Sequence, residues 1–180
     1  MKYVAFLRGI NVGGNKMVKM DDLKKAFESL GFENVRTLLA SGNVVFETTR
    51  EDVAALTKEI EGKLEKIFGF PITGMLRTSE EIHALMVADP FKHVRITPRT
   101  RLLVSFLAEE HKSTLKTPYM SPDRKFNILH IYSREVCSTF ELAEQGGTPE
   151  LMKILEQEFG KKVTTRTWNT VNKIWILLER

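Results

Sequence analysis

Residues 34–47 read Asn34-Val-Arg-Thr-Leu-Leu-Ala-Ser-Gly-Asn-Val-Val-Phe-Glu47. Two β-rich runs, 34–40 and 44–47, are joined here by Ser41-Gly42-Asn43. A short Gly/Asn linker between two such runs is typical of a tight hairpin. Because a hairpin makes its two strands antiparallel neighbours, this stretch predicts an antiparallel pair within the first sheet.

The segments on either side of the hairpin alternate between strand and helix patterns. Residues 2–8 are apolar at consecutive positions, which predicts a strand in a sheet that is covered on both faces. Apolar residues at helical spacing run from 20 to 30 and stop at Gly31, and a longer amphipathic pattern runs from 53 to 69. Residues 72–77 predict a further strand. The order βαββαβ is that of the ferredoxin-like split βαβ unit.

The second half is predicted to repeat the first. It is preceded by a short helix that starts at the capping box Thr78-Ser79-Glu80-Glu81 and ends at Pro90, and by a basic linker. The predicted elements are strands at 101–107, 125–131, 135–141 and 162–166, helices at 109–117 and 148–160, and a last helix with Val171, Ile174, Trp175 and Leu178 on one face.

These patterns predict an α+β protein made of two ferredoxin-like (βαββαβ) subdomains packed together, with a C-terminal helix. The expected domains are residues 1–89 and 90–180. Their duplication is inferred from the order of the elements, since identity between the halves is not evident in the sequence.

Composition narrows the class of protein. The apolar content of 42% is ordinary for a globular protein, and the N-terminal apolar run stops at Arg8, too short for a signal peptide or a membrane span. We therefore expect a cytoplasmic protein without membrane contact. The single cysteine, Cys137, excludes an internal disulfide and is expected to be a buried structural thiol.

Neither a metal nor a cofactor is predicted. The four histidines are too far apart in sequence to form a metal motif. Ser41 lacks the surroundings of a serine nucleophile, and the aromatic pattern of RNA-recognition motifs is missing from 44–47.

The net charge of +4 is concentrated in three stretches. Residues 8–25 contain five Lys or Arg against two Asp, while 91–101 and 160–173 each contain four Lys or Arg and no acid. If these stretches converge, they form a basic face for nucleic acid or phosphorylated ligands. The alternative is solvated charge scattered over separate loops.

The loop Arg8-Gly-Ile-Asn-Val-Gly-Gly-Asn-Lys16 carries the main functional signal. Gly and Asn tolerate backbone angles that turn successive N–H groups toward one point, which attracts phosphate or carboxylate. In a 4-1-3-2 sheet the ends of the first two strands share an edge, so this loop is expected beside the hairpin. The candidate ligand-binding residues are Arg8, Asn11, Gly13, Gly14, Asn15, Lys16, Ser41, Gly42 and Asn43.

The composition of this loop allows two other interpretations. Gly9 and Gly14 have the spacing of a P-loop, but Asn15 intervenes before the lysine and Met17 replaces the Ser or Thr that binds magnesium. This argues against a P-loop hydrolase. In the second interpretation the glycines only shape a turn and the asparagines hydrogen-bond it shut.

Several motifs resemble the bacterial family known as domain of unknown function 1697. They are Phe6-Leu-Arg-Gly-Ile-Asn-Val-Gly-Gly-Asn15, Leu30-Gly31-Phe32, Ser41-Gly-Asn-Val-Val-Phe46 and Thr164-Thr-Arg-Thr-Trp-Asn-Thr-Val171. The resemblance implies two ferredoxin-like halves and brings no established activity.

The resemblance also implies that Arg166, Trp168 and Asn169 complete the site, with Arg and Trp stacking on a ring and Asn reading its edge. Thr167 stands where the family usually has Asn, which bears on affinity or specificity. In the alternative, Trp168 is the first core residue of the last helix, with Thr167 or Asn169 as its N-cap.

The favoured function is binding of a phosphate-bearing ligand, a nucleotide or a nucleic-acid segment, at residues 8–16 and 41–43. The alternatives are an enzyme acting on an anionic small molecule and a protein-interaction module. The sequence names no catalytic residue.

Overall fold

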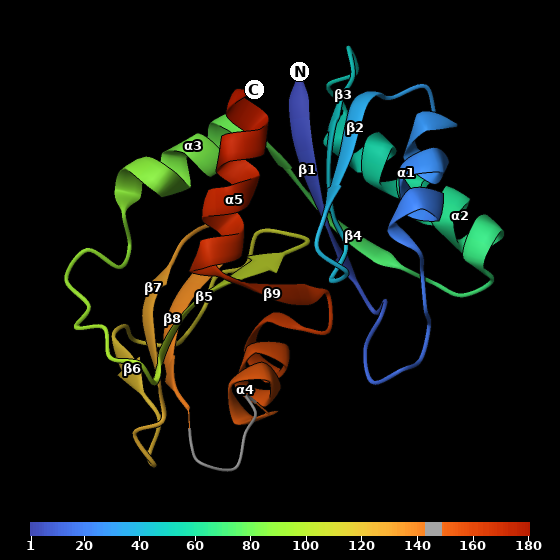
Figure 1. Cartoon of the computed structure of the whole chain (residues 1–180). Coiled ribbons are helices and arrows are strands. Elements are labelled where there is room, and N and C mark those ends of the chain that lie inside the picture. The colour runs from blue at the N-terminus through green and yellow to red at the C-terminus, as the bar shows by residue number, and fades with distance from the viewer. Residues whose placement is uncertain (143–148) are drawn as a thin grey trace. The chain divides into compact units, whose positions relative to one another are not determined.

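The computed structural model describes residues 1–142 and 149–180 (Figure 1). Within these ranges the protein is α+β, with two antiparallel sheets and five helices. The predicted helix start at Thr148 lies outside the described residues.

The chain divides into two compact units. Unit 1 consists of Met1–Ala84 and Lys173–Arg180, and unit 2 of Leu85–Asn172. Two helices, α3 (Ser79–Ala88) and α5 (Trp168–Glu179), contain the points at which the chain passes from one unit to the other. The predicted domains 1–89 and 90–180 stay a prediction.

Unit 1 has the element order and the strand order expected from its sequence. Its elements are β1 (Lys2–Arg8), α1 (Met20–Glu28), β2 (Glu33–Leu38), β3 (Asn43–Glu47), α2 (Val53–Phe68) and β4 (Thr73–Thr78). The strands are ordered β2-β3-β1-β4, which is the predicted 4-1-3-2 order read from the other edge. Gly69, at φ 80°, ends α2 in the left-handed conformation that glycine adopts without strain.

The core of unit 1 lies between this sheet and the helices α1 and α2 (Figure 1). Tyr3, Ala5 and Leu7 of β1 belong to this core, and Phe32 stacks on Phe46 with ring centroids 4.5 Å apart. The intervening residues of β1 are also fully buried. The predicted burial of both faces of β1 is therefore confirmed.

Unit 2 contains a second antiparallel sheet. Its elements are β5 (Thr100–Leu107), β6 (Tyr119–Met120), β7 (Phe126–Ile131), β8 (Glu135–Glu141), α4 (Pro149–Phe159) and β9 (Val163–Thr167). The strand order is β6-β7-β8-β5-β9. The short strand β6, which pairs with β7, was not predicted.

The prediction of a helix at 109–117 is wrong. Residues 108–118 form an irregular segment, in which the Ser113 hydroxyl and the Thr114 N–H donate to the Glu158 carboxylate at 2.7 and 2.8 Å. These bonds attach the segment to α4, and its Ser and Thr residues are weak helix formers. Unit 2 therefore lacks the first helix of the predicted βαββαβ order.

The two sheets share a strand register that the sequence did not reveal. Val4 of β1 pairs with Arg77 of β4, and Val104 of β5 pairs with Arg166 of β9. With this alignment β1 and β5 carry identical residues at three positions, which are Val4 and Val104, Phe6 and Phe106, and Leu7 and Leu107. Both arginines are buried.

The loop after β1 folds back as a small hairpin. The Asn11 N–H donates to the Lys16 carbonyl and the Asn15 N–H to the Val12 carbonyl, both at 3.1 Å. Gly13 and Gly14 occupy the turn with φ of 60° and 77°. Two positive angles are the mark of a type I′ turn, which Gly-Gly adopts readily.

The Asn11 side chain ties this loop to the turn between β2 and β3. Its Nδ2 donates to the carbonyls of Val18 at 3.0 Å and Ala40 at 2.7 Å. Its Oδ1 accepts from the Val18 N–H at 2.7 Å. We call these three bonds the Asn11 bridge.

Loss of the Asn11 bridge should destabilise the protein. We expect Asn11→Ala to lower the free energy of unfolding by about 1 to 3 kcal/mol, since hydrogen bonds are lost and Ala fits the φ of 53° poorly. Urea unfolding measures this. Asn15→Ala is the matched control, because Asn15 is exposed, and should stay within about 0.5 kcal/mol. Equal stability of the two variants would contradict the structural role of Asn11.

A buried hydroxyl in the core of unit 2 predicts a substitution that stabilises the protein, in contrast to Asn11→Ala. Ser138 is fully buried and its Oγ has no hydrogen-bond partner among the described residues. Ser138→Ala should raise the free energy of unfolding by about 1 kcal/mol, because an unpaired buried hydroxyl is costly. Ser105→Ala should instead lower it, since the equally buried Ser105 bonds Thr165 Oγ1 at 2.7 Å. Thermal unfolding of both variants tests the contrast, and destabilisation by Ser138→Ala would disprove it.

Candidate functional site

The loop after β1 and the hairpin turn after β2 lie side by side at one edge of the unit 1 sheet, as the topology predicted. The Leu7 N–H donates to the Gly42 carbonyl at 2.8 Å, beside the Asn11 bridge to Ala40. A Cβ on Gly42, which has φ 81°, would lie 2.6 Å from Ile10 Cδ1. Only glycine allows the two segments to approach this closely.

Two of the predicted ligand-binding residues serve this framework. Asn43 is fully buried, and its Nδ2 donates to the Leu38 carbonyl at 2.8 Å and to Ser41 Oγ at 3.1 Å. The amide hydrogens of Asn11 are likewise used within the protein. Asn11 and Asn43 therefore behave as the second interpretation of the loop expects, because their side chains hydrogen-bond to the loop and to the turn.

Other predicted residues are available at the surface. Gly13, Gly14, Asn15, Lys16 and Ser41 are exposed. The N–H groups of Gly13 and Gly14 make no hydrogen bond within the part of the chain that the structure describes.

Two cations flank this surface. The Lys16 Nζ lies 5.5 Å from the centroid of the Phe70 ring, a cation–π distance that holds the charge near the sheet edge. Arg8, the last residue of β1, is half-buried opposite Thr73. The edge therefore combines two free N–H groups with positive charge.

The remaining predicted residues belong to unit 2. Arg166 is 8% exposed, and its Nη1 donates to Thr164 Oγ1 at 2.8 Å and to the Thr165 carbonyl at 2.9 Å. Burial lowers the pKa of Arg166 to about 10, so the guanidinium stays charged at neutral pH.

Trp168 has the surroundings of a structural residue. Its half-buried ring packs edge-on against Phe91 with centroids 5.3 Å apart. Thr167 Oγ1 accepts the Thr170 N–H at 3.2 Å, as an N-cap does. Asn169 is exposed. It stays a prediction that Arg166, Trp168 and Asn169 form one ligand site together with the loop of unit 1.

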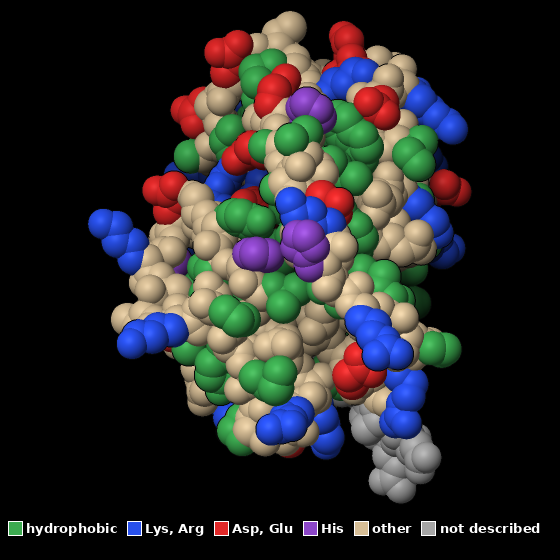
Figure 2. Space-filling model, turned by 90° about the vertical axis from the view of Figure 1, so that its left-hand side faces the viewer, with side chains coloured by type: hydrophobic (Ala, Val, Ile, Leu, Met, Phe, Trp, Pro, Cys, Tyr) green, Lys and Arg blue, Asp and Glu red, His purple; other side chains and the backbone are tan. Residues whose placement is uncertain are grey.

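Lysine and arginine side chains on the face drawn in Figure 2 lie among carboxylates. The convergence of the three basic stretches stays a prediction, because they belong to both units.

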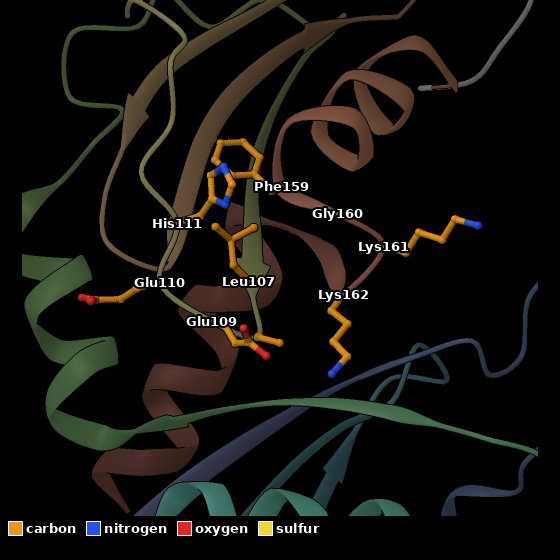
Figure 3. A pocket seen from close by; sticks show the side chains of 9 residues that line it. Leu107, Glu109, Glu110, His111, Phe159, Gly160, Lys161 and Lys162 are labelled. Atoms are coloured by element: carbon orange, nitrogen blue, oxygen red, sulfur yellow. The ribbon is translucent and has the colours of Figure 1, made fainter.

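A pocket that the sequence did not indicate lies in unit 2. It has a volume of about 220 Å³ (Figure 3). Its lining residues come from the segment after β5 and from the α4–β9 connection, and they are Leu107, Ala108, Glu109, Glu110, His111, Phe159, Gly160, Lys161 and Lys162. The incorrect prediction of a helix at 109–117 is the reason that the sequence did not indicate this pocket. A helix there would place the residues after 108 away from Phe159.

Few other reactive groups stand out. Cys137 is buried, and desolvation raises the pKa of its thiol, which makes it a poor nucleophile. Among the residues described, no group of three or more His, Cys, Asp or Glu side chains could hold a metal ion. None of the described helices is long and apolar enough to cross a membrane.

Comparison with known proteins identifies relatives without a described activity. No curated protein matches the chain significantly. A solved structure described as that of the conserved bacterial protein SP0830 from Streptococcus pneumoniae is similar, with a TM-score of 0.70 and 20% sequence identity over 98% of each chain. At that identity the likeness shows the fold alone.

A family model matches residues 1–136, which include the loop after β1 and the hairpin turn. The matched part is well over half of the chain. The chain therefore belongs to the family described as Protein of unknown function (DUF1697).

Proposed function

We propose that residues 8–16 and 41–43 of unit 1 bind a phosphate-bearing ligand, a nucleotide or a nucleic-acid segment. The supporting observation is the exposed Gly13-Gly14 turn, whose unbonded N–H groups stand beside Lys16 on a loop fixed by the Asn11 bridge. A fixed turn loses little conformational entropy when a ligand binds.

The proposed roles differ among the residues. Gly13 and Gly14 would donate N–H groups to phosphate oxygens, while Lys16 and Arg8 supply charge. Asn11 and Asn43 hold the frame. The half-buried Phe70 ring lies under the Lys16 ammonium and packs against the core of unit 1, which holds the Lys16 charge beside the turn. We take the protein to be cytoplasmic, where both proposed kinds of ligand occur.

One observation favours the protein-interaction alternative. Val12 and Met17, on either side of the turn, are 69% and 70% exposed. Apolar side chains at the tip of a fixed loop are suited to a protein partner.

We further propose that both units derive from one ferredoxin-like plan by duplication. The support is the common register of Val4 with Arg77 and of Val104 with Arg166, and the shared strand order of the four main strands in each sheet.

Ligand binding should raise the melting temperature. A nucleotide at about a hundred times its dissociation constant adds roughly 2.7 kcal/mol of stability, and each kcal/mol shifts the midpoint by about 2 to 4 °C for a chain of this size. Melting curves with nucleotides, sugar phosphates, polyphosphate and short single-stranded RNA check this. The absence of a shift with every phosphate compound would refute the proposal and leave the protein-interaction alternative.

Lys16→Gln should weaken binding of single-stranded RNA and reduce the slope of log affinity against log salt by about 1, because one phosphate contact is lost. Fluorescence anisotropy at several salt concentrations measures both quantities. Lys58→Gln removes the same charge from an exposed position on α2 and is the control. If both variants lose affinity equally, only general charge is involved and the assignment of Lys16 is wrong.

A further inference from the structure

We propose that the pocket of unit 2 in Figure 3 binds a free α-amino acid with an apolar or aromatic side chain. This site is separate from residues 8–16 and does not depend on the function proposed for them. Three features carry the inference, namely how the walls are fixed, how charged and apolar groups are distributed, and how large the pocket is.

Backbone hydrogen bonds fix the pocket walls. The Leu107 N–H donates to the Arg134 carbonyl at 2.9 Å, and the Ala108 N–H donates to the Lys162 carbonyl at 3.1 Å. The second bond joins the segment after β5 to the α4–β9 connection, so the two walls are held together by the main chain. The pocket is therefore largely formed before a ligand arrives.

One end of the pocket carries a charge of each sign. Figure 3 shows Glu109 and Lys162 at the same end, both below the Leu107 side chain. Neither side chain makes an ion pair or hydrogen bond with any residue that the structure describes. A carboxylate and an ammonium group at one end of a pocket complement, in the sign of their charges, the ammonium and carboxylate groups of an α-amino acid.

The other end is apolar. The His111 ring meets the Phe159 ring edge-on, with centroids 5.2 Å apart and an interplanar angle of 78°. Figure 3 shows these rings above Leu107, away from Glu109 and Lys162. A ligand with its charges at Glu109 and Lys162 would lay its side chain against Phe159 and Leu107.

The two neighbouring charges do not take part. Glu110 accepts a hydrogen bond from the Ser133 hydroxyl. Figure 3 shows Glu110 and Lys161 pointing away from the pocket on opposite sides. They therefore provide matched controls for Glu109 and Lys162.

Charge balance favours a zwitterion over an ion of one sign. Glu109 and Lys162 are both exposed, so each attracts an opposite charge without being desolvated. A zwitterion can pair with both groups at once, whereas a simple anion or a simple cation pairs with one of them and is repelled by the other.

The size limits the ligand further. The pocket volume of about 220 Å³ lies below the range of about 300 to 1,000 Å³ usual for sites of drug-sized molecules. This favours a ligand of the size of a single amino acid.

The test compares L-phenylalanine with two analogues that each lack one charge, 3-phenylpropionate and 2-phenylethylamine. In NMR titrations of the ¹⁵N-labelled full chain, L-phenylalanine should shift the amide signals of residues 107–111 and 159–162. Each analogue should bind about tenfold more weakly or worse, since one charged hydrogen bond is lost. Glu109→Gln should remove the preference over 3-phenylpropionate, and Lys162→Gln the preference over 2-phenylethylamine.

The control variants Glu110→Gln and Lys161→Gln should leave both preferences unchanged, as should Lys58→Gln in unit 1. Equal binding of 3-phenylpropionate by the wild-type protein would show an anion site and overturn the proposal. Equal binding of 2-phenylethylamine would show a cation site and overturn it as well. Unshifted signals at about 10 mM L-phenylalanine, a concentration above any affinity of biological use, would mean that the pocket is no amino-acid site.

Discussion

The first strand of each sheet, β1 or β5, is an interior strand that must find hydrogen-bond partners on both of its edges, and this requirement governs the rest of the structure. The residues from Tyr3 to Leu7 are at most 1% exposed, so water cannot satisfy their N–H and C=O groups. β3 and β4 do so as antiparallel neighbours, and β8 and β9 do the same for β5. Once these partners are set, the loop after the first strand and the following hairpin turn share one edge in both units.

This common frame supports different chemistry at the two edges. In unit 1 the segment after the first strand places Lys16 over Phe70, just beyond the helix-ending Gly69. In unit 2 the corresponding segment places His111 against Phe159, just before the helix-ending Gly160. The backbone hydrogen bonds from Leu7 to Gly42 and from Leu107 to Arg134 occupy equivalent positions, so the end of the first strand is held in the same way in both units. The segments that follow differ in backbone as well as in side chains, since unit 1 has a small hairpin followed by α1 and unit 2 has the irregular segment 108–118.

The sequence predicted what depends on local pattern. The elements of unit 1 followed from apolar periodicity and from turn residues such as Gly31 and Gly69, and the meeting of loop and hairpin followed from their topology. The helix at 109–117 failed because its residues bind Glu158, a partner 44 residues from Thr114 that no local pattern reveals. The structural role of Asn11 could not be predicted from the sequence either, because an asparagine in such a loop can bind a ligand or close the loop. The three hydrogen bonds of the Asn11 bridge show that it closes the loop. The pocket depends on two segments about fifty residues apart, and its discovery required the fold.

The Asn11 bridge and the hairpin bonds fix the conformation of the loop after β1 at its base. None of these bonds involves a side chain at the tip of the loop. Positive φ constrains Gly13, Gly14 and, at 53°, Lys16. Substitutions at Val12, Asn15 and Met17, all exposed, should cost little folding free energy. Selection on these positions acts on recognition alone, so descendants of one ancestral chain can diverge in what they recognise while inheriting an unchanged scaffold.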